Sequence, residues 1–105
     1  MARRLGMTAA VVEHWNPHAR IRQDLFGCID VLACGSQGVL GIQATTKPNA
    51  RARMRKALAE PRLEAWLASG AAFEVWGWHS PKPRRWDCVR MPLTLDAWRE
   101  GQGDE

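Results

Sequence analysis

The sequence predicts an α/β (α+β) fold, a small mixed β-sheet flanked by helices, with its elements in the order α-β-β-α-β-β-α. First, two apolar runs within residues 24–46 meet at a Gly-Ser-Gln-Gly turn, which is typical of a β-hairpin. Second, residues 72–80 alternate along the chain and are rich in β-forming side chains. Third, residues 50–60 form a helical pattern that follows a capping asparagine. Helices and strands that alternate in this way favour a sheet with helices packed on it.

The first element is predicted to be a helix through "AAVVEHW", residues 9–15. Thr8 is its expected N-cap, and Pro17 should end it within a couple of residues. Residues 18–25 show no clean period and are predicted to form a loop or a short irregular strand. The two strands of the hairpin then follow.

Two helical pieces are predicted after the hairpin. Asn49 is the expected N-cap of the helix over residues 50–60. Pro61 should break that helix and start a second piece over residues 61–69, with Gly70 just past its end.

The C-terminal third is predicted to hold two strands and one helix. After the strand at residues 72–80 comes a loop, "SPKPR", and then a strand over residues 85–91. A short helix over residues 94–100 should be capped by Thr94.

The length of 105 residues suits a single core. We expect one domain over residues 8–100, a flexible tail at 1–7 and a disordered tail at 101–105. No run approaches the roughly 18 apolar residues that a membrane helix needs. The short apolar run near the N-terminus is interrupted by Glu13 and His14, so no signal peptide is predicted and a cytoplasmic protein is expected.

Three cysteines are present, Cys28, Cys34 and Cys88. Their number is odd, and none of them forms a C-x-x-C pair of the kind that binds metal. They are predicted to be buried, reduced thiols within strands, as is usual in a cytosolic protein.

Basic residues exceed acidic ones by 15 to 11, giving a net charge of +4. Such an excess is compatible with a polyanionic partner. The basic residues cluster in two short segments and are candidate contacts to nucleic-acid phosphates: Arg51, Arg53, Arg55, Lys56, Lys82, Arg84 and Arg85. The alternative for the first segment is an ordinary solvated helix face.

One polar side chain interrupts each apolar run of the hairpin, Asp30 in the first and Gln43 in the second. If Ser36 and Gln37 are the two turn residues, Asp30 lies directly opposite Gln43, with Cβ atoms roughly 5 Å apart. The plain alternative is a buried hydrogen bond between them, or a pair of edge residues that face water.

The same residues are candidate ligands for a divalent cation. An ionised Asp30 among apolar neighbours needs a compensating positive charge. Gln43 offers a second oxygen and Glu13 a third, while Asp24 is either a further ligand or a loop residue in a local turn. Carboxylate and amide oxygens suit a hard ion such as Mg²⁺, which polarises a phosphodiester and activates water to attack it.

This arrangement of Glu13, Asp30 and "QAT" at residues 43–45, followed by a basic helix, resembles the PD-(D/E)XK nuclease superfamily. That superfamily has the restriction-endonuclease-like fold and includes Holliday-junction resolvases. Residues 13–46 are also similar to small proteins of phages and bacteria that are thought to belong there. The resemblance covers roughly residues 8–79.

The resemblance implies a core in the order αβββαβ and cleavage of DNA that depends on Mg²⁺, or on Mn²⁺. It implies metal ligands at Glu13, Asp30 and Gln43, and a setting in the cytoplasm of a bacterial or phage-infected cell. It leaves open whether the substrate is branched, ended or single-stranded, or is RNA. A homodimer is one option, since junction-cutting members of the superfamily work as dimers.

Two departures from the superfamily bear on activity. Its first core strand would have to come from residues 19–23, and Thr45 stands where a catalytic lysine is expected. Lys47 projects from the same strand face if the strand runs that far. Arg51 or Arg53 is the other candidate. Otherwise the chain is a degenerate nuclease-fold protein that binds nucleic acid or a protein partner without cleavage.

The sequence contains six tryptophans and no tyrosine. Trp76 and Trp78 share one face of a predicted strand, where they would stack on unpaired bases or pack against the helix that precedes them. The tryptophans at predicted helical positions are expected in the core: Trp15, Trp66 and Trp98.

Overall fold

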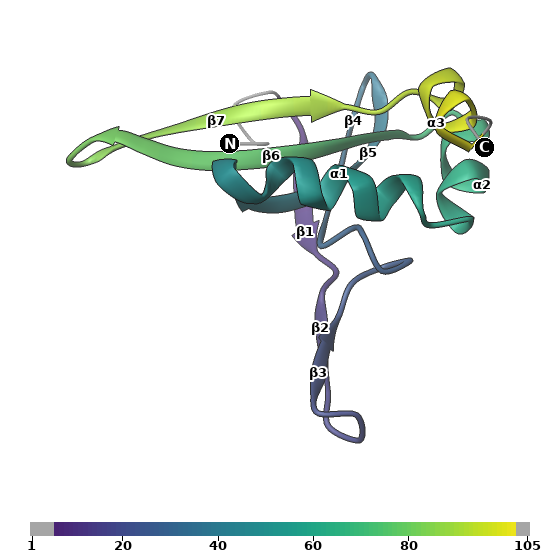
Figure 1. The fold of residues 1–105 in the computed structure, drawn as a ribbon, viewed down its shortest axis with the longest axis horizontal. Helices are drawn as coiled ribbons and strands as arrows, with labels where there is room; N and C mark the ends of the chain where they lie inside the picture. The colour runs from purple at the N-terminus through teal and green to yellow at the C-terminus, as the bar shows by residue number, and fades with distance from the viewer. Residues whose placement is uncertain (1–5, 103–105) are drawn as a thin grey trace.

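The computed structural model describes residues 6–102 and shows a mixed five-stranded sheet with three helices. The sheet has the order β1-β4-β5-β6-β7, with strands β1 (Thr8–Val11), β4 (Val31–Gly35), β5 (Gly38–Thr46), β6 (Ala72–Lys82) and β7 (Arg85–Pro92). The helices are α1 (Ala50–Leu58), α2 (Arg62–Ala68) and α3 (Leu95–Gln102). A separate two-stranded ribbon, β2 (His14–Asn16) with β3 (Ile21–Gln23), projects away from the sheet (Figure 1).

The predicted N-terminal helix is wrong, because this segment forms β1 and β2. β1 pairs antiparallel with β4, placing Thr8 opposite Cys34 and Val11 opposite Val31. A lone helix of seven residues is marginal in water, whereas the edge of β4 offers this segment a row of backbone partners. The β-branched Val11 also favours a strand. The chain therefore starts with a strand at the edge of the sheet.

The hairpin of β4 and β5 has the register that the turn predicts. Gly35 lies opposite Gly38 and Val31 opposite Ile42, so Ser36 and Gln37 are the two turn residues. The first strand is shorter than its apolar run, because β4 begins only at Val31 and the preceding residues form a turn.

β5 and β6 run parallel, and the connection between them contains α1 and α2. Asn49 occupies the N-cap position of α1, although its side chain makes no capping hydrogen bond. Pro61 separates the two helices as predicted, and Gly70 follows α2 with a φ of 95°, which a glycine adopts without strain.

β6 and β7 form a long hairpin that continues through most of the predicted loop. β6 extends to Lys82 and β7 begins at Arg85, so only two residues form its turn. The last helix is also longer than predicted, since α3 runs to Gln102. Thr94 caps it by accepting a hydrogen bond at Oγ1 from the Ala97 amide at 3.1 Å. Residues 1–5 and 103–105 of the expected tails lie outside the described residues.

α1 and α2 pack on one face of the sheet, and α3 packs against these two helices at the end of the sheet (Figure 1). Phe73 and Val75 of β6 face this helical layer. Trp76 and Trp78 face the opposite side, so the expectation that they pack against the preceding helix is wrong. Trp76 is nevertheless buried, within a second cluster on that side. None of the helices in residues 6–102 combines the length and apolar character needed to cross a bilayer.

Only one cysteine matches the expectation of a buried thiol. Cys28 is fully buried in the turn before β4, Cys34 is exposed in β4, and Cys88 is partly exposed in β7. Burial raises the pKa of the Cys28 thiol to about 11, so this thiol is inert at neutral pH.

Gly41 in β5 allows a close approach between the sheet and the layer above it. A Cβ atom at this position would lie 2.7 Å from Cδ1 of Ile29 and 3.0 Å from Cζ2 of Trp66. We predict that Gly41→Ala lowers the free energy of unfolding by about 1–3 kcal/mol in urea titration, because it overpacks a closed core. Ile29→Val removes the nearest methyl group, so the double variant should recover part of the loss. Unchanged stability of Gly41→Ala would contradict this packing.

Candidate metal centre

A five-residue turn brings Asp24 close to Asp30. Leu25 and Ile29 exchange two backbone hydrogen bonds of 2.8 and 3.0 Å, and this bridge closes the turn. The chain reverses through Phe26 and Gly27, whose φ values of 54° and 72° lie in the left-handed region. Asp24 and Asp30 flank this bridge on its two sides.

Glu13 reaches the same place through two backbone interactions. The carbonyl oxygen of Asp30 accepts hydrogen bonds from the amides of Val12 at 2.9 Å and Glu13 at 3.3 Å. In the ribbon, His14 lies opposite Gln23. Continuing that register places Glu13 opposite Asp24, so Glu13 comes from the root of a β-ribbon and not from a helix.

The three carboxylates of Glu13, Asp24 and Asp30 converge. One oxygen from each lies within 4.8 Å of the others. Oxygens that bind one Ca²⁺ at 2.3–2.6 Å stand up to about 5 Å apart, and Mg²⁺ at about 2.1 Å needs them slightly closer. The donor set is entirely oxygen, so its spacing and chemistry fit a hard divalent cation.

Asp30 and Gln43 interact as the hairpin register predicts. Nε2 of Gln43 donates a hydrogen bond to Oδ2 of Asp30 at 3.0 Å, and the amide of Ala44 donates to both carboxylate oxygens at 3.1 and 3.2 Å. The plain alternative of a buried hydrogen bond is therefore part of the site. Gln43 is only 3% exposed, and its Oε1 is the buried side-chain oxygen or nitrogen that lacks a hydrogen-bond partner among residues 6–102.

This orphan oxygen is a second feature that a bound cation would satisfy. An unsatisfied buried acceptor costs about 1–3 kcal/mol. A half-turn of the Gln43 amide would exchange Nε2 with Oε1 and present an oxygen toward Asp30, which is favourable if a cation lies between them or if Asp30 is protonated. The amide thus adds a fourth candidate oxygen to the three carboxylates.

The electrostatic environment of Asp30 would also favour a bound cation. Burial raises the pKa of Asp30 above its ordinary value, the hydrogen bond from the Ala44 amide opposes the rise, and the charges of Asp24 and Glu13 add to it. Within the described part of the chain, the ion pair made by this cluster is that of Arg22 with Glu13 at 3.3 Å. The cluster therefore holds three carboxylates against one paired guanidinium, an excess of acidic groups that would favour a bound cation.

Lys47, the first candidate for the missing lysine, does not lie in the strand, while Arg51 and Arg53 lie in α1 as expected. β5 ends at Thr46, and Lys47 begins a short 3-10 turn over Lys47–Asn49 that contains Pro48. The condition under which Lys47 would share the face of Gln43 is therefore not met. Thr45 keeps that face by strand alternation and is half-buried.

The predicted nucleic-acid contacts separate into two surfaces. Arg51, Arg55 and Lys56 are exposed on α1, and Arg53 is partly exposed. A second group lies at the projecting end of the β6–β7 hairpin (Figure 1), and its three members are all exposed: Lys82, Arg84 and Arg85.

A hollow of about 430 Å³ lies beside the acidic cluster, between the ribbon and the helical layer. Asp24 lines it together with three basic side chains, Arg22 from β3, Lys56 from α1 and Arg62 from α2. Arg62 is already paired with Glu60 at 2.9 Å. Arg22 and Arg62 were not singled out from the sequence. For Arg22, a signal existed in its position two residues before the candidate ligand Asp24.

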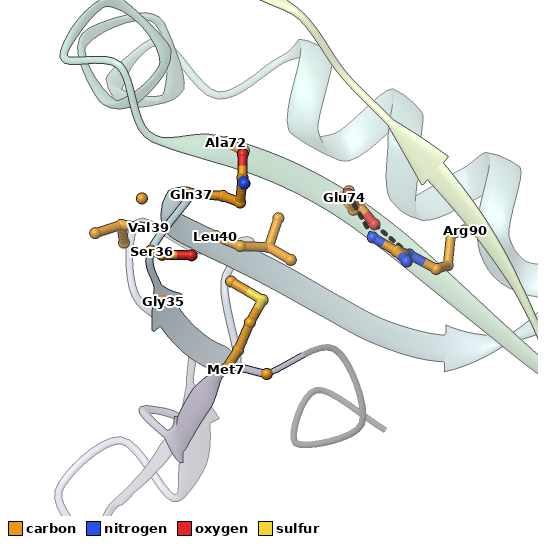
Figure 2. A pocket seen from close by; sticks show the side chains of 11 residues that line it. Met7, Gly35, Ser36, Gln37, Val39, Leu40, Ala72, Glu74 and Arg90 are labelled. Atoms are coloured by element: carbon orange, nitrogen blue, oxygen red, sulfur yellow. Dashed lines mark hydrogen bonds and ion pairs between the residues drawn. The ribbon is translucent and has the colours of Figure 1, made fainter.

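A second hollow of about 300 Å³ lies on the opposite face of the sheet, near the β4–β5 turn (Figure 2). Its charged members, Glu74 and Arg90, pair with each other at 2.7 and 3.0 Å. The pKa of Glu74 is lowered: burial would raise it, but hydrogen bonds from Arg90 and Trp76 outweigh that effect. Because these charges are satisfied internally, this hollow offers much less to an ionic ligand than the acidic cluster does.

The ionised side chain of Asp30 should lower the free energy of unfolding when no cation is bound. Because its pKa is raised on folding, the folded state holds this proton more tightly than the unfolded chain, and stability falls as pH rises through the ordinary Asp range. We predict that Asp30→Asn raises the melting temperature at pH 7 in EDTA, since asparagine carries no charge and can donate to Oε1 of Gln43. The gain should shrink as the pH is lowered toward about 4.

Asp96→Asn on exposed α3 is the matched control and should give no such gain. A lower melting temperature for Asp30→Asn at pH 7 would contradict the assignment of electrostatic strain to this carboxylate.

Comparison with known proteins found no relative of this chain. No family model matches the chain, and no curated protein or solved structure gives a significant match. The chemistry of the candidate centre is therefore inferred from its own residues.

Proposed function

We propose that this protein is a nuclease that uses a divalent cation, Mg²⁺ or Mn²⁺, to hydrolyse phosphodiester bonds of DNA. The observation that carries the proposal is the convergence of Glu13, Asp24 and Asp30 within 4.8 Å. A half-turn of the Gln43 amide would add its unpartnered oxygen to the same cluster as a neutral donor.

The chain order of the elements supports the proposal. If the ribbon strands β2 and β3 are set aside, β1, β4 and β5 precede the two helices and β6. The core that the resemblance implies likewise has three strands before a helix and a further strand, but it starts with a helix that this chain lacks among its described residues. Among the candidate ligands, Gln43 lies in β5 and Asp30 directly precedes β4, while Glu13 and Asp24 lie at the root of the ribbon.

Each residue has a role that follows from its contacts. Asp30 is fixed by the Ala44 amide and Gln43, so it is a preorganised ligand. Asp24 lines the hollow, where Arg22 and Lys56 can bind phosphate oxygens. A bound cation would supply Lewis-acid polarisation of the phosphodiester and would lower the pKa of the attacking water. The basic side chains hold the substrate against the carboxylates, which alone would repel it.

A second candidate function is binding without cleavage. The observation in its favour is Thr45, which gives the strand a neutral side chain where the superfamily has a cation, while Lys47 lies in the following turn. Basic residues on α1 and on the β6–β7 hairpin would still bind phosphates in such a protein.

We predict that Asp24→Asn and Asp30→Asn each weaken Mn²⁺ binding by about 100-fold or more, beyond the range seen for the outer partners of metal ligands. Electron paramagnetic resonance titration of free Mn²⁺ measures this directly, and cleavage of labelled DNA should fall in parallel. Asp96→Asn, an acidic residue far along the chain on α3, should bind as the parent does. Equal Mn²⁺ affinity in all four proteins would refute the metal centre.

Thr45→Lys separates the two candidate functions. We expect the parent to cleave slowly and Thr45→Lys to increase the rate by about 100-fold, the scale of one added transition-state charge contact. Thr46→Lys adds the same charge on the opposite strand face and should have little effect. If none of the three proteins cuts DNA or RNA with Mg²⁺ or Mn²⁺, catalysis is excluded and the binding function remains.

A further inference from the structure

We propose that the β2–β3 ribbon is a base-stacking arm, and that the protein therefore prefers nucleic acid with unpaired nucleotides next to the metal centre over a fully paired duplex. The stacking residue is Trp15, with Arg22 beside it. This inference rests on the proposed function, because it names the substrate class of the same centre.

The arm presents a tryptophan to solvent. Trp15 is 54% exposed, although its position in the sequence predicts a core residue. It lies opposite Arg22 in the antiparallel ribbon, which projects beyond the body of the protein (Figure 1). The exposed indole ring is therefore accessible for stacking on a partner.

Trp15 shares its face of the ribbon with the candidate ligands. Side chains alternate along a strand, so Glu13 and Trp15 lie on the same face, about 7 Å apart along the backbone. The ion pair of Arg22 with Glu13 across the ribbon agrees with this. The spacing is comparable to that of successive nucleotides in an extended strand. If one phosphate of a nucleic-acid strand lies at the carboxylates, the neighbouring base therefore lies at the Trp15 ring.

The charge of the arm fits an anionic partner. Residues 14–23 contain two arginines and two histidines and no acidic residue. Arg20 at the tip has a φ of 56°, and it is exposed. Aromatic rings combined with arginines are the usual means of holding single-stranded nucleic acid, because every base has a face that can stack.

The arrangement is less suited to a second copy of the chain. The other exposed apolar residue of the ribbon, Ile21, pairs with Asn16 and therefore lies on the face opposite Trp15. The two do not form the contiguous apolar patch that a stable protein interface needs. A stacking contact requires only the single ring.

The test compares two labelled DNAs of equal length by fluorescence anisotropy in EDTA, a blunt duplex and a fork with unpaired arms. We expect the parent to bind the fork more tightly. Trp15→Ala should weaken fork binding about tenfold or more and duplex binding little, and Trp15→Phe should retain most of the preference. Ile21→Ala is the matched control on the opposite face and should leave the preference intact.

Two results would overturn the proposal: a parent that binds fork and duplex equally, or a Trp15→Ala variant that loses both equally or neither. Light scattering detects the competing role, because conversion of a dimer to a monomer by Trp15→Ala would assign this face to a second copy. EDTA removes the metal centre from the measurement. The fork preference is therefore measured without the cation, and failure of the nuclease proposal would leave this result unchanged.

Discussion

The structure depends on the backbone and side-chain contacts of one buried residue, Asp30. Asp30 lies where the end of β1, the start of β4 and the middle of β5 meet, and its backbone carbonyl accepts from Val12 and Glu13 while its amide donates to Ile42. Its side chain is held at the same point by Gln43 and the Ala44 amide. The residue that knits three segments together is thus also the one whose ionisation the surroundings disfavour. Folding alone gives no reason to keep a charge there, since an amide could make most of the same contacts.

The remaining features of the candidate centre are arranged around that carboxylate. The turn between Leu25 and Ile29 returns the chain to it and delivers Asp24, while the root of the ribbon delivers Glu13. The helical layer lies beside the same point and contributes Lys56 and Arg62 to the neighbouring hollow. The acidic side chains therefore form one cluster, and the basic side chains line the hollow beside it. This separation is the one expected at a site that binds a cation and a phosphate together.

Local features of the structure could be predicted from the sequence, whereas features that depend on long-range contacts could not. The pairing of Asp30 with Gln43 was predictable, because two glycines around a two-residue turn set the register of the whole hairpin. The helix after Asn49 and the break at Pro61 follow from equally local rules. The choice of Glu13 and Asp24 as candidate ligands came from their chemistry, and their convergence depends on tertiary contacts.

The N-terminal segment shows why the rest could not be predicted. Ala9 and Ala10 favour a helix as strongly as any residue, and only the exposed edge of β4, formed later in the chain, makes them a strand. Trp15 was expected in the core for the same reason, since a helical placement would have turned it inward. Asn16 and Pro17 did carry a turn signal that would have indicated the ribbon.

Glu13 precedes the ribbon in the chain and Asp24 follows it, so both candidate ligands lie at its root. This position has a mechanical consequence. A cation shared by Glu13 and Asp24 would act as a crosslink that closes the intervening segment into a loop, in the way that a disulfide does. Whatever orders that segment would then tighten the crosslink, and the crosslink would order the segment in return. The ion would thus stiffen the part of the chain that stands furthest from the core.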